Sequence, residues 1–321
     1  MDPIRLVFLG AGEIAVPVLR ELSASAEIQL CGIITQPDRP AGRKNRLAAT
    51  PLGAFADASG LTAERVPDVN APEFLAKLRA TSPDLVLVVS FGQLLKSELL
   101  ALPRYGCLNL HASLLPRYRG ASPIVQCLLN CDAETGVDLM KMEAGLDTGA
   151  VYRTWKYRLN GSEYADELEI ALGELAAANL VPALREVVSG RLTPVPQVEA
   201  AATVCRKIKK HDGDIDWNAS AKRIEAMVRA YRPWPGAVMR LISSRGEQTA
   251  IVLKAKVLTG SAEPPGHVLD AGTRRLIISC GSGALEIEQL QPSGGKAMTA
   301  AAFLNGLRGE LPQVKLTDLN D

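Results

Sequence analysis

Blocks of apolar residues alternate with amphipathic segments along the first two hundred residues. Three short runs predict strands: residues 4–9, which fit a buried strand, residues 28–35, and residues 84–90, whose nearly continuous apolar character fits a parallel strand buried on both faces. The segments between them have helical periodicity and predict helices that end near residue 24 or lie near 51–58 and 71–79. Strands that alternate with helices are typical of an α/β fold with a doubly wound parallel sheet.

Further apolar runs continue this pattern and then give way to a different texture. Strands are predicted at 107–110, 137–142 and 150–159, and a long helix at 163–189. After Gly190 the chain holds two prolines and few apolar residues, so residues 190–205 are predicted to be a linker. One helix and five short strands follow it: residues 219–231, 237–242, 249–258, 267–269, 275–280 and 285–290. Short strands between glycine-rich turns favour a small β-barrel such as an OB-fold, with a sandwich as the alternative.

Size and composition are consistent with two globular domains, 1–189 and 206–321, on either side of the linker. The chain has 321 residues, of which 47% are hydrophobic, and no apolar run reaches the roughly 18 residues of a membrane helix. No signal peptide is expected, because a strand-like run follows the first few residues. The six cysteines show no CxxC spacing and indicate free thiols in a reducing cytoplasm.

Charge is distributed unevenly between the two predicted domains. Residues 1–205 hold 19 Lys and Arg against 23 Asp and Glu, whereas residues 206–321 hold 17 against 12. The carboxyl-terminal part is therefore basic, as expected of a domain that contacts a polyanion. Two clusters of basic residues are candidates for phosphate contact: Arg39, Arg43, Lys44 and Arg46 in a long loop at 36–47, and Arg206, Lys207, Lys209 and Lys210 after the linker. The second cluster continues along and past the following helix with Lys222, Arg223, Arg229 and Arg232.

The candidate chemistry lies at the end of the predicted strand 107–110. Asn109 and His111 are two residues apart and so point to the same side of an extended chain. An amide can hold a developing oxyanion while an imidazole moves a proton, although a turn amide and a structural histidine would look the same. Asp147, between Gly145 and Gly149, follows the next apolar run. It is expected in the same crevice, outside the carboxyl ends of the strands.

A second motif, Gly10-Ala-Gly-Glu-Ile-Ala15, follows a strand and opens a helix, as in the dinucleotide-binding fingerprint. That fingerprint also requires an acidic residue at the end of the second strand, where Thr35 and Gln36 stand instead. A plain turn between strand and helix is the interpretation that these residues favour.

Together these motifs resemble the methionyl-tRNA formyltransferase family over essentially the whole chain. The segments that carry the resemblance are Gln36–Arg43, Asn109–Pro123, Asp132–Val137, Gly145–Gly149 and Arg232–Gly236. The second and fourth are similar to elements shared by all 10-formyltetrahydrofolate-dependent formyltransferases and by related hydrolases. The first is more particular to members that act on tRNA. The chain departs from the family at Gly10–Glu13 and at Lys44–Arg46, which leaves the tRNA contacts of the loop open.

The resemblance implies a Rossmann-like amino-terminal domain, a linker and an OB-like tRNA-binding domain. It implies transfer of a formyl group from 10-formyltetrahydrofolate, the co-substrate, to the α-amine of methionyl-initiator tRNA for translation initiation. Asn109, His111 and Asp147 would be catalytic, with no metal required. The folate would lie against a set of neighbouring residues: Ser113, Leu114, Leu115, Pro116, Phe91 and Gly92. A cytoplasmic monomer is expected.

Three alternatives to this function are consistent with parts of the sequence. A relative could formylate the amine of a sugar nucleotide or of a purine precursor, but the basic loop and basic second domain argue against that acceptor. A formyltetrahydrofolate hydrolase would use the same three polar residues, with water in place of the amine. A non-catalytic RNA-binding protein would explain the charge asymmetry but not three matched polar residues.

Overall fold

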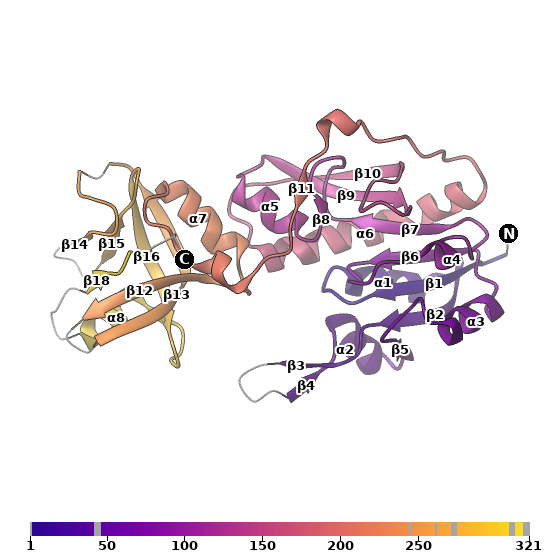
Figure 1. Ribbon diagram of the computed structural model, residues 1–321, viewed down its shortest axis with the longest axis horizontal. Helices are drawn as coiled ribbons and strands as arrows, with labels where there is room; N and C mark the ends of the chain where they lie inside the picture. The colour runs from indigo at the N-terminus through magenta and orange to yellow at the C-terminus, as the bar shows by residue number, and fades with distance from the viewer. Residues whose placement is uncertain are drawn as a thin grey trace. The chain divides into compact units, whose positions relative to one another are not determined.

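The computed structural model of the chain (Figure 1) describes residues 2–41, 46–243, 246–260, 262–270, 275–307 and 312–316. Its internal contacts divide the chain into two compact units. The first unit comprises residues 1–123, 133–159 and 167–205. The second unit comprises residues 124–132, 160–166 and 206–321. Two short segments from the middle of the chain therefore pack with the carboxyl-terminal part.

A seven-stranded sheet forms the centre of the first unit, in the order β10-β9-β7-β6-β1-β2-β5. The strands are β1 (Ile4–Gly10), β2 (Ile28–Thr35), β5 (Ala63–Arg65), β6 (Leu85–Val89), β7 (Cys107–His111), β9 (Glu134–Lys141) and β10 (Val151–Arg158). From β5 to β7 all neighbouring strands are parallel, whereas β9 is antiparallel to both β7 and β10. The predicted α/β fold is confirmed, with a sheet that is mostly parallel rather than wholly so.

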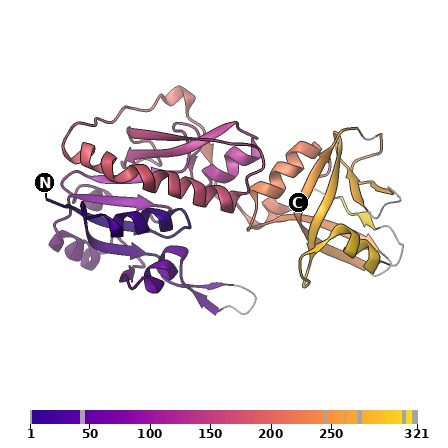
Figure 2. The same cartoon turned by 180° about the vertical axis from the view of Figure 1, so that it is seen from behind.

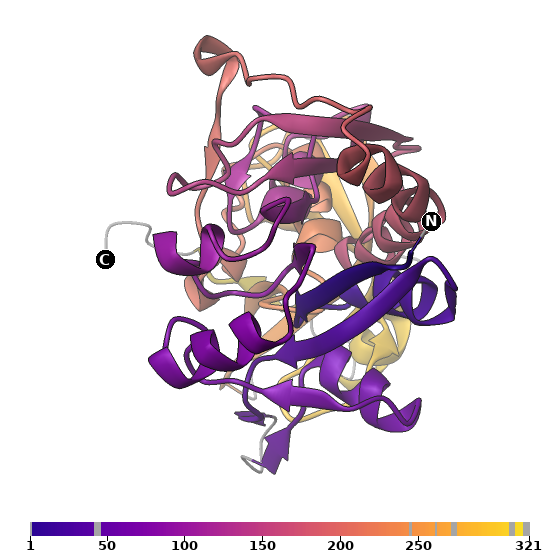
Figure 3. The ribbon, with the colours of Figure 1, turned by 90° about the vertical axis from the view of Figure 1, so that its right-hand side faces the viewer.

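Helices cover both faces of this sheet (Figures 2 and 3). On one face lie α1 (Ala15–Ala24) and the long α6 (Ala165–Val188), which are joined where the Ile14 amide donates to Glu169 Oε1 at 3.3 Å. On the other face, α3 (Pro72–Ala80) and α4 (Ser97–Leu100) bury apolar side chains against β1 and β6. Helix α2 (Pro51–Ala58) begins at Thr50, whose hydroxyl accepts a hydrogen bond from the Gly53 amide. Among the described residues, no helix is long and apolar enough to cross a membrane.

Two segments expected to be irregular contain strands. The predicted loop at 36–47 begins and ends in a two-stranded antiparallel ribbon of β3 (Arg39–Ala41) and β4 (Arg46–Ala48). In the predicted linker, Val195 forms a β-bridge with Val151, and β11 (Val204–Cys205) pairs with β8 (Arg119–Gly120). A 3₁₀ turn, η1, at Glu199–Ala201 lies between them. Residues 190–205 therefore lie along the first unit.

The second unit is built on an antiparallel, nearly closed barrel, as the strand pattern after residue 206 predicts. Its strands are β12 (Ala237–Ser243), β13 (Gly246–Leu258), β14 (Val268–Asp270), β15 (Leu276–Ser279), β16 (Ala284–Pro292), β17 (Met298–Thr299) and β18 (Gln313–Val314). Its helices are α5 (Pro123–Leu129), η2 (Lys210–Gly213), α7 (Ala221–Ala230) and α8 (Ala300–Gly306). Helix α7 packs mainly on β13. The proposed boundaries at 189 and 206 remain a prediction.

Candidate active site

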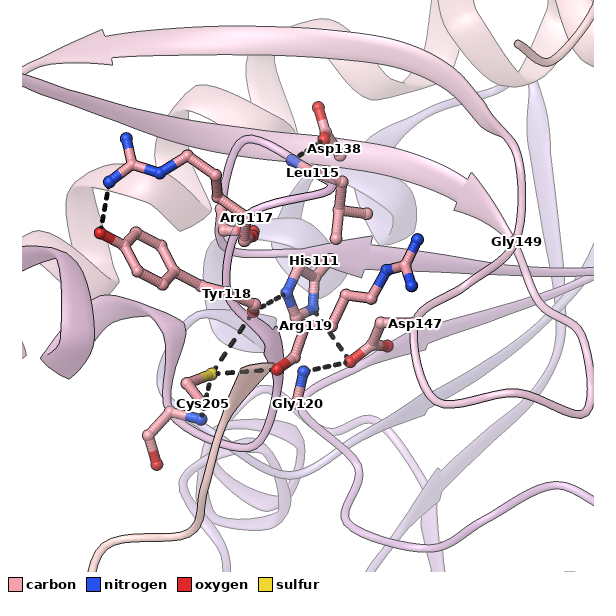
Figure 4. A network of polar contacts seen from close by, with 12 residues as sticks. His111, Leu115, Arg117, Tyr118, Arg119, Gly120, Asp138, Asp147, Gly149 and Cys205 are labelled. Atoms are coloured by element: carbon pink, nitrogen blue, oxygen red, sulfur yellow. Dashed lines mark hydrogen bonds and ion pairs between the residues drawn. The ribbon is translucent and has the colours of Figure 1, made fainter. Parts of the chain in front are cut away.

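His111 ends strand β7, and its imidazole ring is held through both nitrogens (Figure 4). The side chain is only 6% exposed. Nε2 lies 2.9 Å from the Tyr118 carbonyl oxygen, and because a carbonyl can only accept, Nε2 carries a hydrogen. Nδ1 faces Asp147 Oδ2 at 3.7 Å. Sequence reasoning missed the Tyr118 carbonyl, which fixes the orientation of the ring.

Asp147 reaches His111 by a route different from the one expected. Strand β9 is antiparallel to β7, so its last residue, Lys141, pairs with Leu108 near the beginning of β7. The expectation that Asp147 sits at a carboxyl end shared with β7 is therefore wrong. The loop between β9 and β10 folds back instead, with Asp147 at a positive φ of 51°. Its Oδ2 accepts a hydrogen bond of 2.8 Å from the Gly120 amide, which aims the carboxylate at the imidazole.

The loop that carries Asp147 is held by residues of the predicted linker. Gln197 Nε2 donates to the Asp147 carbonyl at 2.8 Å and to the Gly149 carbonyl at 2.7 Å. The Gln197 side-chain oxygen in turn accepts from Arg119 Nε at 3.0 Å. Arg119 is 4% exposed and also makes two hydrogen bonds of 2.9 Å to the Glu199 carboxylate. The predicted linker therefore supports the Asp147 loop directly.

Asn109 provides an unoccupied hydrogen-bond donor beside this pair. It lies two residues before His111 in β7, so both side chains project from the same face of the sheet. The residue is half-buried, and within the described part of the chain its side-chain amide has no hydrogen-bond partner. Such a donor is available to an oxygen that develops negative charge next to it.

The predicted folate residues differ in how much surface they offer. Ser113 is fully buried and its hydroxyl donates to the Arg117 carbonyl at 2.7 Å, so it stabilises the turn. Phe91 is 3% exposed, with its side chain in the core under α3 and α4, and its carbonyl accepts from Gln36. Gly92 has open space beside its Cα and a φ of +83°. The remaining three residues are half-buried: Leu114, Leu115 and Pro116.

A second carboxylate, which sequence reasoning missed, lies next to His111. Asp138 is directly opposite His111 in the β7–β9 pair and is 1% exposed. Its Oδ2 accepts a hydrogen bond of 2.7 Å from the Leu115 amide, whereas Oδ1 is buried and has no hydrogen-bond partner among the described residues. Burial raises the pKa of the Asp138 carboxyl to about 6, although Thr154, the Leu115 amide and the positive charge of His111 act to lower it.

The basic residues predicted to contact tRNA fall into three groups. Arg39 and Arg46 are exposed on the β3–β4 ribbon, with Arg39 3.3 Å from Gln36 Oε1, while Arg43 and Lys44 lie outside the described residues. Three lysines at the start of the second unit are exposed: Lys207, Lys209 and Lys210. Arg206 is also exposed but makes two hydrogen bonds to Asp212, which lower the pKa of that carboxyl to about 2.

The expectation that α7 extends this basic surface is wrong for Arg229, whereas Lys222 and Arg223 are exposed. Arg229 is 6% exposed and forms an ion pair with Glu225 at 2.7 Å. Arg232 forms an ion pair with Asp166 and stacks on the Tyr164 ring, 3.7 Å from its centre. Arg223 donates to the Leu129 carbonyl. The charges of Arg229 and Arg232 are therefore paired within the second unit, whereas the charge of Arg223 stays at the surface.

Comparison with known proteins supplies the family. Residues 4–184 match the family described as "Formyl transferase", and residues 207–308 match "Formyl transferase, C-terminal domain". The methionyl-tRNA formyltransferase of Geobacter metallireducens is 39% identical over 98% of this chain and 99% of its own length. The enzyme of that name from Xylella fastidiosa is 42% identical over 95% of this chain and 98% of its own. The chain belongs to the methionyl-tRNA formyltransferase family.

This membership confirms the resemblance on which the sequence prediction rests. Solved structures share the family's fold at lower identity. HypX from Aquifex aeolicus in complex with tetrahydrofolic acid superposes with a TM-score of 0.65 at 15% identity, over 99% of this chain and 51% of HypX. WlaRD, a sugar 3N-formyl transferase, superposes with a TM-score of 0.60 at 16% identity, over 89% of this chain and 98% of its own. At such identity these two structures establish the shared fold only.

Proposed function

We propose that this chain transfers the formyl group of 10-formyltetrahydrofolate to the α-amine of methionyl-initiator tRNA. Methionyl-tRNA formyl transfer is the activity that membership of the family brings, and the proposal adds the donor, the initiator tRNA and the roles of residues. The observation that carries it is the Asn109 amide, which has no hydrogen-bond partner among the described residues and lies beside the His111–Asp147 pair at the end of β7. These three groups suit an acyl transfer to an amine.

In this reaction a bond forms between the amine nitrogen and the formyl carbon, and the bond from that carbon to folate N10 breaks. The amine loses a proton and N10 gains one. The chain must therefore stabilise negative charge on the formyl oxygen and move a proton nearby. Asn109 is the donor whose geometry leaves it free for the oxygen.

His111 and Asp147 are suited to the proton transfer. Because the Tyr118 carbonyl fixes Nε2–H, Nδ1 is the nitrogen that faces Asp147. A proton passes between Nδ1 and Asp147 when their 3.7 Å separation shortens to hydrogen-bond distance or one water bridges it. A positive imidazole in this buried place also stabilises the oxyanion electrostatically. For His111 to donate a hydrogen bond to the oxygen itself, Nε2 must first leave the Tyr118 carbonyl.

The folate is assigned to the turn that follows His111. Leu114, Leu115 and Pro116 are half-buried apolar residues next to the reacting groups, as a flat aromatic ligand requires. Gly92, at the end of the neighbouring strand β6, leaves space beside its backbone. Ser113 and the Phe91 side chain contribute through the structure of the turn and the core.

The direct test is formyl transfer from 10-formyltetrahydrofolate to charged initiator tRNA, with charged elongator methionyl-tRNA as the acceptor control. We expect rapid transfer to the initiator and much slower transfer to the elongator. An amino sugar nucleotide, and no acceptor at all, complete the assay. Preferred transfer to the sugar amine, or rapid formate release without acceptor, would contradict the proposal in favour of the other two enzymatic functions.

Gln197 is expected to matter because it holds both carbonyls of the Asp147 loop. Gln197→Ala should lower kcat on the order of tenfold, since small misplacements of a catalytic group are costly, and should leave the KM for tRNA nearly unchanged. The neighbouring Val198, 66% exposed, gives the matched control Val198→Ala. Wild-type turnover in Gln197→Ala at saturating substrates would show that the loop holds its position without this support.

The lysines at the start of the second unit are expected to contact tRNA phosphates. Replacing Lys207, Lys209 and Lys210 together by Gln should raise the KM for tRNA and flatten its dependence on salt, because each lost phosphate contact lowers the slope by about 0.9. Folate KM should not change. The matched control replaces Arg206, whose charge is paired with Asp212, and should flatten the slope less. An unchanged salt slope in the triple variant would show that these lysines are only solvated.

A further inference from the structure

The Asp138 carboxylate has an environment that needs a physical explanation. Both of its neighbours in the sheet are polar: His111 from β7 and Thr154 from β10 are its cross-strand partners. It is 1% exposed, yet in the part of the chain that the structure describes Oδ1 has no hydrogen-bond partner. A buried, half-satisfied carboxylate is costly and is retained where it serves a neighbouring group.

Two structural features connect Asp138 to the proposed reaction: its cross-strand pairing with His111 and its hydrogen bond to the Leu115 turn. Residues directly opposite each other in an antiparallel pair share one face of the sheet, so Asp138 and His111 project to the same side. The other contact is the 2.7 Å hydrogen bond from the Leu115 amide, within the turn proposed to receive the folate. In Figure 4 the imidazole lies between the carboxylates of Asp138 and Asp147.

We propose that Asp138 is a positioning residue for formyl transfer, which fixes the Leu115 turn and, when ionised, stabilises positive charge on His111. Because Asp147 already faces Nδ1, the second carboxylate strengthens the charge that the oxyanion requires. His111 is the charged group that acts on Asp138 from β7, while β10 and the turn present the uncharged Thr154 and Leu115 amide. The inference rests on the proposed function.

The protonation of Asp138 then makes turnover depend on pH. Burial raises the pKa of this carboxyl to about 6, so its charge is present above that value and is lost as the pH falls through it. The α-amine of the acceptor also loses reactivity in acid, because it is protonated, and this contribution to the pH dependence of kcat must be separated from that of Asp138. The ratio of the kcat of wild type to the kcat of Asp138→Asn does this, because the same amine is present in both reactions.

At saturating substrates we expect this ratio to be about ten at pH 8, the effect of one pK unit of charge stabilisation, and to approach one at pH 5. Asp138→Asn keeps an oxygen for the Leu115 amide, so the KM for folate should stay near that of wild type. Asp138→Ala removes this acceptor as well and should also raise the KM for folate. A ratio that is constant with pH, or equal to one at pH 8, would overturn the proposal.

Two further measurements separate this role from a purely structural one. Asp84 lies at the opposite end of the sheet, where its carboxylate accepts a hydrogen bond of 3.0 Å from the Arg5 amide. The ratio of the kcat of wild type to the kcat of Asp84→Asn should be near one at every pH. In the unmodified chain, the carboxyl carbon resonance of the buried Asp138 should titrate at a pH of about 6, above the range of an ordinary aspartate. That titration tests the proposal even if the variants fail to fold, and its absence would contradict it. Failure of the proposed function can be distinguished from failure of the Asp138 proposal, because in the former case the wild-type protein itself would not formylate methionyl-tRNA.

Discussion

Asn109→Ala is expected to lower kcat on the order of 10²–10³-fold, the cost of removing one oxyanion donor. The reason is that the Asn109 amide is free within the described structure and stands beside His111 on the same face of β7. The KM for methionyl-tRNA should hardly change, because the lost interaction is made in the transition state. Steady-state kinetics with initiator methionyl-tRNA and 10-formyltetrahydrofolate provide the measurement.

Two substitutions control this result. Asn109→Asp keeps the shape but replaces the donor by a negative charge, so it should be at least as damaging as Asn109→Ala. Met140→Leu, at the cross-strand neighbour, keeps the packing and should keep near-wild-type turnover. His111→Ala and Asp147→Ala should each lower kcat severely. The loss of kcat in the double variant should be much smaller than the product of the two single losses, because the residues act as a unit. Full activity in any of the three single variants would refute the assignment.

Gly149→Ala is expected to lower kcat about a hundredfold, although Gly149 contacts no substrate in the proposed mechanism. A Cβ at this position would lie 1.8 Å from the Lys141 carbonyl oxygen. Lys141 cannot move aside easily, because it pairs with Leu108 in the sheet and its amide donates to Ala150 at 2.9 Å. The loop must therefore shift and carry Asp147 away from His111.

The matched control is Gly32→Ala in β2, where an added Cβ would find its nearest neighbour, a Val7 methyl, at 3.6 Å. That substitution meets only ordinary van der Waals contact and should leave kcat near that of wild type. Thermal unfolding of both variants should show a loss of stability on the order of 1–3 kcal/mol for Gly149→Ala only. Wild-type kcat in Gly149→Ala would mean that the loop tolerates displacement.

The sequence predicts the strands and helices of the first unit well where local signals are strong. The apolar run 28–35 is strand β2, and Thr50 with Pro51 begins α2 at the expected residue. The direction of β9 could not be predicted, because an apolar run has the same pattern whichever way the strand runs. Strand direction depends on pairing with residues far along the chain, and the antiparallel pairing with β7 changes where Asp147 comes from.

The candidate site could likewise be predicted only where its residues are close together in the sequence. Asn109 and His111 stand two residues apart at a strand end, so their juxtaposition is local. Asp138 has a signal in the sequence, since it is an acidic residue between the apolar residues Val137 and Leu139 of a predicted strand. Gln197 had none: it lies 50 residues from Asp147 in a proline-rich segment without periodicity, and only the folded chain brings them together. Arg229 looked like surface charge until its burial beside Glu225 was known.

The course of residues 191–205 decides where related chains can be recombined. Consider a chimaera in which the carboxyl-terminal domain of a relative is joined directly after α6. In it, Gln197 and strand β11, which pairs with β8, are replaced by residues whose natural partners lie in the relative's own amino-terminal part. A junction after Cys205 keeps both with the loop that they support. Because residues 124–132 and 160–166 pack with the carboxyl-terminal part, an exchange that begins at Arg206 must carry those two segments as well, while residues 191–205 must be inherited with the Asp147 loop.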